Sequence, residues 1–286
     1  MIRLDNAGIL LTGASRGIGK ALALTLAGTG AFLSLVARDE AGVRQTSQEI
    51  IRRGGRALPL TGDVSRPEAV FRLVRQAQEA MGQIDILVNV AGIQAPIGPF
   101  HENDLATWEK IFKVNFFGAL HLIHTVLPQM MVRRRGKIIN FSGGGATAPR
   151  PNFSAYAASK AALVRFTETL AEELKPYNIQ VNAVAPGAVN TQMLDEVLAA
   201  GEKAGAEYHQ ARERTRTGGT PVELVCELVK FLASQASGAL TGKLISAPHD
   251  PWREWQDKVE ELNETPMFTV RRLDPFTIKP LIKNLR

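Results

Sequence analysis

Tyr156 and Lys160 are the two residues whose types and spacing most directly suggest chemistry. Because they are four residues apart, they share one face if the segment is helical. A free phenol has a pKa of about 10, which makes it too weak an acid for proton transfer near neutrality. A lysine cation about 4 Å away favours the phenolate by roughly 4 kcal/mol at an effective dielectric of about 20, and so lowers that pKa. The pair predicts a tyrosine that acts as general acid and base.

A glycine-rich segment near the start of the chain predicts a phosphate-binding loop. Residues 12–19 read TGASRGIG, follow an apolar run and precede apolar residues at helical spacing. In a dinucleotide-binding loop of this kind, glycines allow a tight turn, close approach of the backbone to the pyrophosphate and close packing of the helix on the strand. The N–H groups that begin the helix then face the phosphate. The predicted binding residues are Gly13, Ser15, Arg16, Gly17, Ile18 and Gly19.

In their order and separation, these two motifs resemble the short-chain dehydrogenase/reductase family, from about residue 5 to about residue 246. The resemblance implies a nicotinamide dinucleotide that carries the hydride, with Tyr156 and Lys160 beside it and Lys160 on its ribose. It also implies that Asn115 kinks a helix predicted over 108–132 and holds a water leading to the lysine. The other cofactor residues implied by the resemblance are Asp63 and Val64 at the adenine, Asn89, Ala91 and Gly92 after the fourth strand, and Pro186, Gly187, Val189 and Thr191 at the nicotinamide carboxamide.

The serine of the family's catalytic set is displaced in this chain. The family places it thirteen residues before the tyrosine, where this chain has Gly143, and Ser142 stands one position earlier. Side chains on a strand alternate between faces, so this slip turns Ser142 away from the substrate unless a bulge intervenes. Three successive glycines at 143–145 permit such a bulge, and their N–H groups could instead bind the substrate oxygen. Ser142 is predicted as a catalytic residue, with the glycine amides as the alternative.

The end of the second predicted strand favours NADP(H) over NAD(H). Enzymes that use NAD place a carboxylate there for the ribose 2′-hydroxyl, whereas this chain has Ala37 followed by Arg38. Arg16 lies within reach of the same point, and two guanidinium groups suit a 2′-phosphate. Asp39 leaves NAD(H) as the alternative.

Apolar runs bounded by turn residues alternate with helix-like segments, which predicts repeated βαβ units. The sequence therefore predicts an α/β fold, a doubly wound Rossmann-type parallel sheet of seven strands with helices on both faces, as one domain over residues 1–246. The predicted strands cover 8–12, 32–37, 57–60, 84–89, 137–141, 180–185 and 243–246. Residues 186–219 are long for a connection and are predicted to fold over the substrate. Residues 247–286, rich in proline and aromatic residues, form a C-terminal extension that we expect to pack on the domain or on a neighbouring subunit.

Composition narrows the function classes. The 286 residues are 45% hydrophobic and 22% charged, as in ordinary globular proteins. No signal peptide or membrane span is evident, and the single cysteine, Cys226, fits a reducing compartment, so we expect a cytoplasmic protein. The net charge of +6 comes without a nucleic-acid reading motif. His121 and His124 have no third and fourth ligand at metal-site spacing, so no metal is expected. Trp252 and Trp255 are expected to pack the extension onto the body, with stacking on a sugar ring as the alternative.

These features predict an NADP(H)-dependent oxidoreductase that interconverts a secondary alcohol and a ketone on a small molecule, in a homodimer or homotetramer. Residues 240–247 resemble uncharacterised relatives found with nucleotide-sugar and polysaccharide enzymes, which implies a sugar-like substrate. One alternative is a 3-oxoacyl-[acyl-carrier-protein] reductase. Another, based on Gly143, is a cofactor-binding regulatory protein that has lost turnover.

Overall fold

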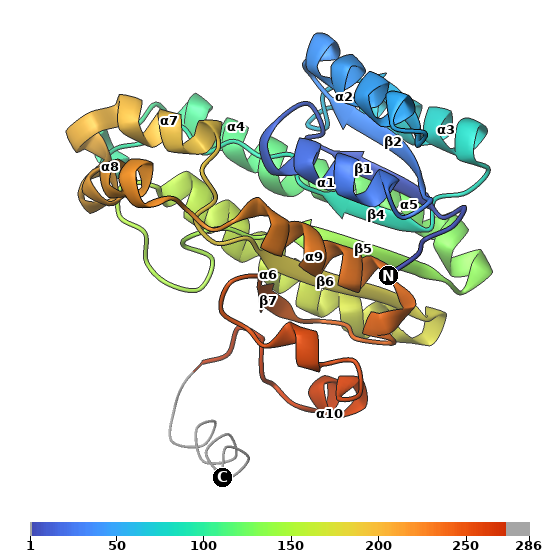
Figure 1. Ribbon diagram of the computed structural model, residues 1–286. Helices are drawn as coiled ribbons and strands as arrows, with labels where there is room; N and C mark the ends of the chain where they lie inside the picture. Colours follow the sequence, from blue (N-terminus) through green and yellow to red (C-terminus); the bar gives the residue numbers. More distant parts are fainter. Residues whose placement is uncertain (1, 273–286) are drawn as a thin grey trace.

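The computed structural model of the protein describes residues 2–272, so Pro275 and Phe276 of the predicted extension lie outside it. Its seven strands form one parallel sheet in the order β3-β2-β1-β4-β5-β6-β7 (Figure 1). The strands are β1 (Gly8–Thr12), β2 (Phe32–Ala37), β3 (Arg56–Thr61), β4 (Ile86–Asn89), β5 (Gly136–Phe141), β6 (Ile179–Ala185) and β7 (Leu244–Ser246). The predicted doubly wound sheet is confirmed. Because the strand order reverses between β1 and β4, their carboxyl ends open the crevice in which such folds bind ligands.

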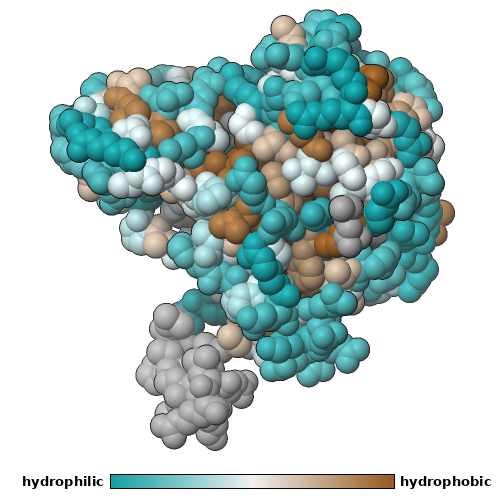
Figure 2. Space-filling model, in the orientation of Figure 1, coloured by the Kyte–Doolittle hydropathy of each residue, from teal (hydrophilic) through white to brown (hydrophobic). Residues whose placement is uncertain are grey.

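Helices cover both faces of the sheet, and the alternation of side chains along the strands decides which core each residue joins. Ile9 and Leu11 of β1 are buried in one core, while Leu10 between them is buried in the other. The first core lies under α1 (Gly17–Ala27), α2 (Glu40–Arg52) and α9 (Val222–Ala233). The second lies under α3 (Pro67–Met81), α5 (Gly118–Arg133) and α6 (Ser154–Leu174). Figure 2 shows hydrophobic residues in the middle of the face on which α1 and α9 lie, and hydrophilic ones around it.

The helix predicted over 108–132 is interrupted. It consists of α4 (Leu105–Phe112), a π-helical segment (Lys113–Phe117) and α5, so the extra residue per turn falls on Asn115. By length and composition the run from Leu105 to Arg133 could cross a membrane. Its α5 part instead packs against α3, with Leu122 and Val126 buried in the core. We interpret it as a core helix, and π-helical turns of this kind are often found at functional sites.

Two helices, α7 (Gln192–Ala200) and α8 (Ala206–Thr217), fold within the long connection at 186–219, and we call this segment the α7–α8 lobe. It stands beside the carboxyl ends of the strands (Figure 1). Leu194 and Val197 of α7 and Ala211 of α8 form a small core with Phe153 and Tyr156. The lobe therefore packs directly on the tyrosine singled out by the sequence.

The tail, residues 247–272, packs on the last strand. Trp252 and Trp255 are both buried in the core under α9, and neither lines the cavity described below. The backbone N–H of Leu244 in β7 donates to the carbonyl of Phe268 at 2.7 Å, so the tail lies where a further strand would pair. It includes α10 (Val259–Glu264). Trp252 and Trp255 thus pack the tail onto the body of the protein, as expected from the sequence.

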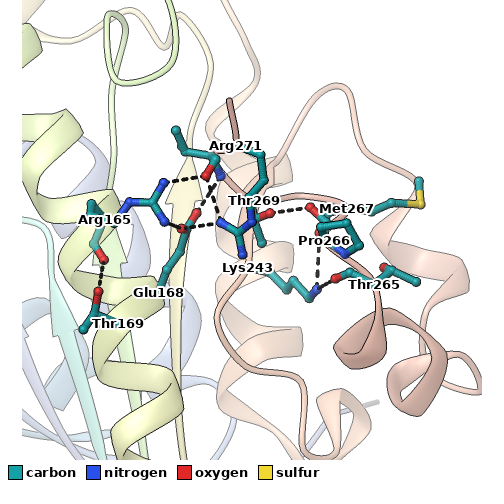
Figure 3. Close-up of polar contacts among 10 residues, drawn as sticks. Arg165, Glu168, Thr169, Lys243, Thr265, Pro266, Met267, Thr269 and Arg271 are labelled. Carbon is teal, nitrogen blue, oxygen red and sulfur yellow. Dashed lines mark hydrogen bonds and ion pairs between the residues drawn. The ribbon is translucent and has the colours of Figure 1, made fainter. Parts of the chain in front are cut away.

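A buried carboxylate fastens the end of the tail to α6 (Figure 3). Glu168 accepts from the N–H of Val270 at 2.6 Å, from Arg271 at 2.9 Å and from Arg165. Lys243 donates to the carbonyl oxygens of Thr265 at 2.7 Å and Met267 at 3.2 Å. Burial, with the charge of Arg271 as a smaller cause, lowers the pKa of Lys243 to about 8. These contacts tie the tail to the same helix that carries Tyr156 and Lys160.

Candidate active site

One cavity of about 470 Å³ opens at the carboxyl ends of the strands, where the strand order reverses. Most of the residues predicted from the sequence line it: Gly13, Ser15, Arg16, Gly17, Ile18, Gly19, Arg38, Asp63, Val64, Ala91, Gly92, Ser142, Tyr156, Lys160, Pro186 and Thr191. Asn89, Asn115, Gly187 and Val189 are not among the lining residues. The lining residues that the sequence did not single out include Val36, Gly62, Val90, Ile93, Val114, Phe141, Gln192, Met193 and Glu196. The apolar ones among them carry no motif, because any apolar residue could occupy such a position.

The glycine loop has the geometry that a phosphate requires. Gly13 and Gly17 have φ values of +71° and +52°, which L side chains rarely adopt. A Cβ on Gly19 would lie 2.1 Å from the carbonyl oxygen of Gly13, so only glycine lets the turn close. No side chain caps the N-terminus of α1, and its free N–H groups begin at the cavity wall. A dinucleotide pyrophosphate therefore fits here.

Thr12 joins the two loops at the switch point, a role that sequence reasoning missed. Its Oγ1 accepts from the N–H groups of Val90 at 3.1 Å and Ala91 at 3.2 Å. Asn89, one residue earlier, instead donates from its side chain to Asn140 inside the sheet at 2.9 Å. Asn89 thus braces β4 against β5 and does not line the cavity. Its cofactor role stays a prediction.

Gly187 and Val189, also outside the cavity lining, are packed behind it. Gly187 has φ +76°, and a Cβ there would lie 2.4 Å from Oγ1 of Thr220 and 2.9 Å from Pro248 of the tail. Val189 packs against the core under α9. Both residues position the segment that brings Pro186 and Thr191 to the cavity, and their direct contact with a cofactor stays a prediction.

The cavity end next to β2 and β3 holds two arginines and two carboxylates. Asp39 caps α2 by accepting from the N–H of Gly42 at 3.1 Å, so its carboxylate is already engaged. Burial opposes ionisation of Asp63, but hydrogen bonds from Ser65 and the charges of Arg38 and Arg66 hold its pKa below the usual value. Arg16 and Arg38 are exposed at the cavity wall. This end therefore offers guanidinium groups to an anion.

Asn115 holds three elements together from the π-helical segment. Its Oδ1 accepts from the N–H of Ile93 and its Nδ2 donates to the carbonyl of the same residue, both at 2.9 Å. Nδ2 also donates to Ser159 of α6 at 3.1 Å. A Cβ added to Gly92 would lie 3.3 Å from Asn115 Oδ1 and 3.5 Å from Lys160 Nζ, so amide and ammonium flank that glycine. Asn115 positions the loop and helix on either side of Lys160.

Tyr156 and Lys160 are both buried and both line the cavity, but they do not interact as the sequence predicted. Lys160 Nζ donates to the carbonyl of Phe141 at 2.8 Å and lies 5.7 Å from the centre of the Tyr156 ring. Burial lowers the pKa of Lys160 to about 8. Burial raises the pKa of Tyr156, and Arg150 is the cation that opposes this rise. The expectation that the pKa of Tyr156 is lowered is therefore not met in this structure, where burial raises it.

Gly143 lies directly against the tyrosine oxygen. A Cβ at Gly143 would be 2.2 Å from Tyr156 Oη, so the hydroxyl occupies the space that a side chain at this position needs. Ser142 is buried, lines the cavity and donates its backbone N–H to Val184 at 2.8 Å. Contrary to the expectation from strict alternation along a strand, Ser142 faces the cavity. Within residues 2–272, none of the N–H groups of glycines 143–145 donates to another residue. Ser142 therefore reaches the cavity, whereas glycines 143–145 are not among its lining residues.

Arg150 is a charged neighbour of the tyrosine that sequence reasoning missed. It forms two hydrogen bonds with Glu207 of α8, at 2.6 and 2.7 Å, and both side chains are largely buried. The guanidinium carbon lies 3.8 Å from the centre of the Phe153 ring and 5.3 Å from that of Tyr156. The ion pair ties the α7–α8 lobe to the loop that precedes Tyr156. The sequence does not indicate that residues 150 and 207 meet, because they lie on different elements and no helical or strand spacing relates them.

Residues 2–272 contain no group of three or more His, Cys, Asp or Glu side chains placed to hold a metal ion.

Comparison with known proteins agrees with this geometry. The family model for short chain dehydrogenases matches residues 7–201. The 2,3-dihydro-2,3-dihydroxybenzoate dehydrogenase of Bacillus subtilis is 35% identical over 237 residues, covering 81% of this chain and 90% of that protein. The 3-oxoacyl-[acyl-carrier-protein] reductase FabG of Thermotoga maritima is 34% identical over 246 residues, covering 85% and 97%. The crystal structure of an NAD⁺-bound xylitol dehydrogenase superposes with a TM-score of 0.79 at 28% identity, covering 85% of this chain and 97% of that one.

Proposed function

The chain belongs to the short-chain dehydrogenase family of oxidoreductases, and within it we propose that the protein interconverts a secondary alcohol and a ketone with NADP(H). The observation that carries the proposal is the Tyr156 hydroxyl, which lies against Gly143 in a cavity that also contains Lys160 and the glycine loop. A cytoplasmic location remains part of the proposal.

In the proposed reaction, the bound nicotinamide supplies a hydride to the carbonyl carbon or takes one from the alcohol carbon. Tyr156 supplies the proton to the carbonyl oxygen as the hydride arrives, so the C=O group becomes CH–OH. Burial raises the pKa of Tyr156, so the phenol holds its proton at neutral pH until negative charge develops on the carbonyl oxygen as the hydride arrives. Ser142, which lines the cavity, holds the substrate oxygen, with the glycine amides 143–145 as the alternative, and Lys160 holds the ribose. Lys160 is cationic below a pH of about 8, which is the range in which it can donate to that ribose.

The chemical proposal is tested by NADPH oxidation with a panel of ketones. We expect turnover by the wild type, none by Tyr156→Phe, and nearly unchanged NADPH affinity in that variant, because only the acid is lost. Lys160→Ala should lower both turnover and affinity. NADPH fluorescence measures binding in the same samples. Turnover by Tyr156→Phe at the wild-type rate would contradict the assignment.

The preference for NADP(H) is supported by Arg16 and Arg38 at the cavity end that has Ala37, and by the engagement of Asp39 as the cap of α2. The xylitol dehydrogenase binds NAD⁺, so the comparison with it does not support a preference for NADP(H). We expect NADPH to bind at least about tenfold more tightly than NADH, and Arg38→Ala to remove most of the difference, as loss of a charge-assisted contact worth roughly 1.5–3 kcal/mol predicts. Arg75→Ala, which removes an exposed arginine of α3 outside the cavity lining, is the control. Equal affinities of the wild type for NADPH and NADH would contradict the arginine argument and would favour Asp39 as the residue that binds the ribose.

A 3-oxoacyl chain on acyl carrier protein is the second candidate substrate. It is favoured by the similarity to the Thermotoga maritima reductase and by the net charge of +6, because acyl carrier protein is acidic. Including an acetoacetyl-carrier substrate in the panel decides between the two. The regulatory alternative is supported by Gly143 alone, and would be favoured by tight NADPH binding without turnover of any substrate.

A further inference from the structure

One carboxyl group in the cavity is not used by the chemistry described above. Glu196 lies on α7, one turn after Gln192, and lines the cavity together with Ile93 and Met193. Its Oε2 is buried and, within residues 2–272, has no hydrogen-bond partner. A buried carboxyl oxygen without a partner loses hydration without compensation, so its complement is a hydrogen-bond donor on a ligand.

Gln94 holds this carboxyl group from behind. Its side chain is only 2% exposed and does not line the cavity. Its Nε2 donates to the carbonyl of Met193, which fastens the first turn of α7 to the loop that follows β4. The Gln94 amide also favours the ionised form of Glu196. Glu196 therefore lies at the cavity wall on a helix whose first turn Gln94 fastens.

The other polar residues around Glu196 do not account for its free oxygen. Arg16 attracts it electrostatically, but no ion pair joins the two in the described part of the chain. Asp195, its neighbour on α7, is exposed and repels it. Tyr156 and Ser142 line the same cavity as Glu196.

We propose that Glu196 binds a hydroxyl group of the substrate, so that the protein acts on carbonyl compounds and alcohols that carry a further hydroxyl. This inference rests on the proposed oxidoreductase function and narrows its substrate class. It assigns specificity to Glu196, with Tyr156 keeping the acid–base role at the reacting oxygen.

A hydroxyl fits Glu196 better than an ammonium group does. Burial raises the pKa of Glu196, with the Gln94 hydrogen bond and the Arg16 charge acting in the opposite direction. A carboxyl group that resists ionisation gains less from a cation, whereas it can both accept from and donate to a neutral hydroxyl.

The test compares cyclohexanone with its three ring-hydroxylated isomers, in which the hydroxyl stands beside the carbonyl, one carbon further or opposite it. The wild type should reduce at least one hydroxycyclohexanone with a kcat/KM roughly tenfold or more above that of cyclohexanone, because a site built to bind a hydroxyl discriminates against its absence. Glu196→Leu should remove most of this preference and Glu196→Gln part of it. Asp195→Asn, which removes the same charge from the exposed side of α7, should keep it. An aminocyclohexanone, assayed in the same way, tests whether the site prefers a cationic substrate.

Three results would overturn the inference. They are a wild type that treats the four ketones alike, a Glu196→Leu variant that keeps the preference while still binding NADPH, and a preference for the amine over every hydroxyl. A Glu196→Leu variant with altered NADPH affinity and an intact preference would assign Glu196 to the cofactor instead. If the wild type reduces none of the ketones, the proposed function fails separately. Calorimetry of the same compounds on the NADP⁺ complex then decides whether hydroxyl-selective binding depends on Glu196, and absence of such binding overturns the inference.

Discussion

At the scale of single residues, the site differs from the expected pattern at position 143. The family serine is replaced by glycine, and the Tyr156 hydroxyl occupies the space that a side chain there needs. The Tyr156 hydroxyl therefore lies closer to the backbone of residue 143 than a side chain at that position would allow. Ser142 reaches the cavity from the preceding position. Which of these groups holds the substrate oxygen is open to a direct kinetic test.

Ser142→Ala is the informative substitution. If Ser142 donates to the substrate oxygen, its loss should lower kcat roughly 10²–10³-fold, the usual effect of removing one such donor. If the glycine amides carry this role, the loss should be small. Gly143→Ala should be strongly damaging in either case, because its Cβ would lie 2.2 Å from Tyr156 Oη. Gly144→Ala, whose Cβ would meet only Arg150 at 3.5 Å, is the matched control. A fully active Gly143→Ala would show that Tyr156 does not need its present position.

At the scale of secondary-structure elements, the site depends on how α8 is fastened to the loop before α6. The Arg150–Glu207 pair is a polar link between them, and its charges act on Tyr156 with opposite signs. Arg150 lowers the pKa of the phenol and Glu207 raises it. The α7–α8 lobe is therefore coupled to Tyr156 through two charges, one that lowers the pKa of the phenol and one that raises it.

Glu207→Gln and Arg150→Met should shift the pH dependence of alcohol oxidation in opposite directions. Oxidation needs the phenolate, so its rate rises with pH through the pKa of Tyr156. Removing the Glu207 carboxylate leaves Arg150 unopposed, lowers that pKa and moves the rise to lower pH. Removing Arg150 raises that pKa and moves the rise to higher pH. Glu202→Gln, which removes an exposed acid from the same lobe, should leave the profile of kcat/KM unchanged. Shifts in the same direction for both variants would mean that the pair acts only by holding the lobe in place.

At the scale of the whole molecule, the tail decides which surfaces remain for self-association. Its backbone pairs with β7 through Phe268, so this edge of the sheet is covered by the chain itself. The helical run from α4 through the π-helical segment to α5, which we call the α4–α5 face, instead exposes three large apolar side chains, Leu105, Phe117 and Val132. We therefore propose that a second copy of the chain packs on the α4–α5 face.

Light scattering at micromolar concentration should give the mass of a dimer or a tetramer. Phe117→Asp should reduce this mass, because it places a charge in the apolar contact. Phe71→Asp changes a phenylalanine of α3 that is 61% exposed, and it should leave the mass unchanged. Retention of NADPH binding shows that either variant is folded. A monomeric wild type would contradict the proposed assembly.

The sequence by itself determined the sheet, the cofactor loop and the tyrosine–lysine pair, because each depends on residues close together in the chain. Strands follow from short apolar runs between turn residues, and residues 156 and 160 share a face on any helix. The tertiary structure decided what depends on distant residues. It placed Ser142 in the cavity, directed Lys160 to Phe141, paired Arg150 with Glu207 and left Glu196 facing the cavity. These contacts join side chains from elements that are far apart in the sequence. The spacing of residues along the chain does not indicate which of these side chains meet.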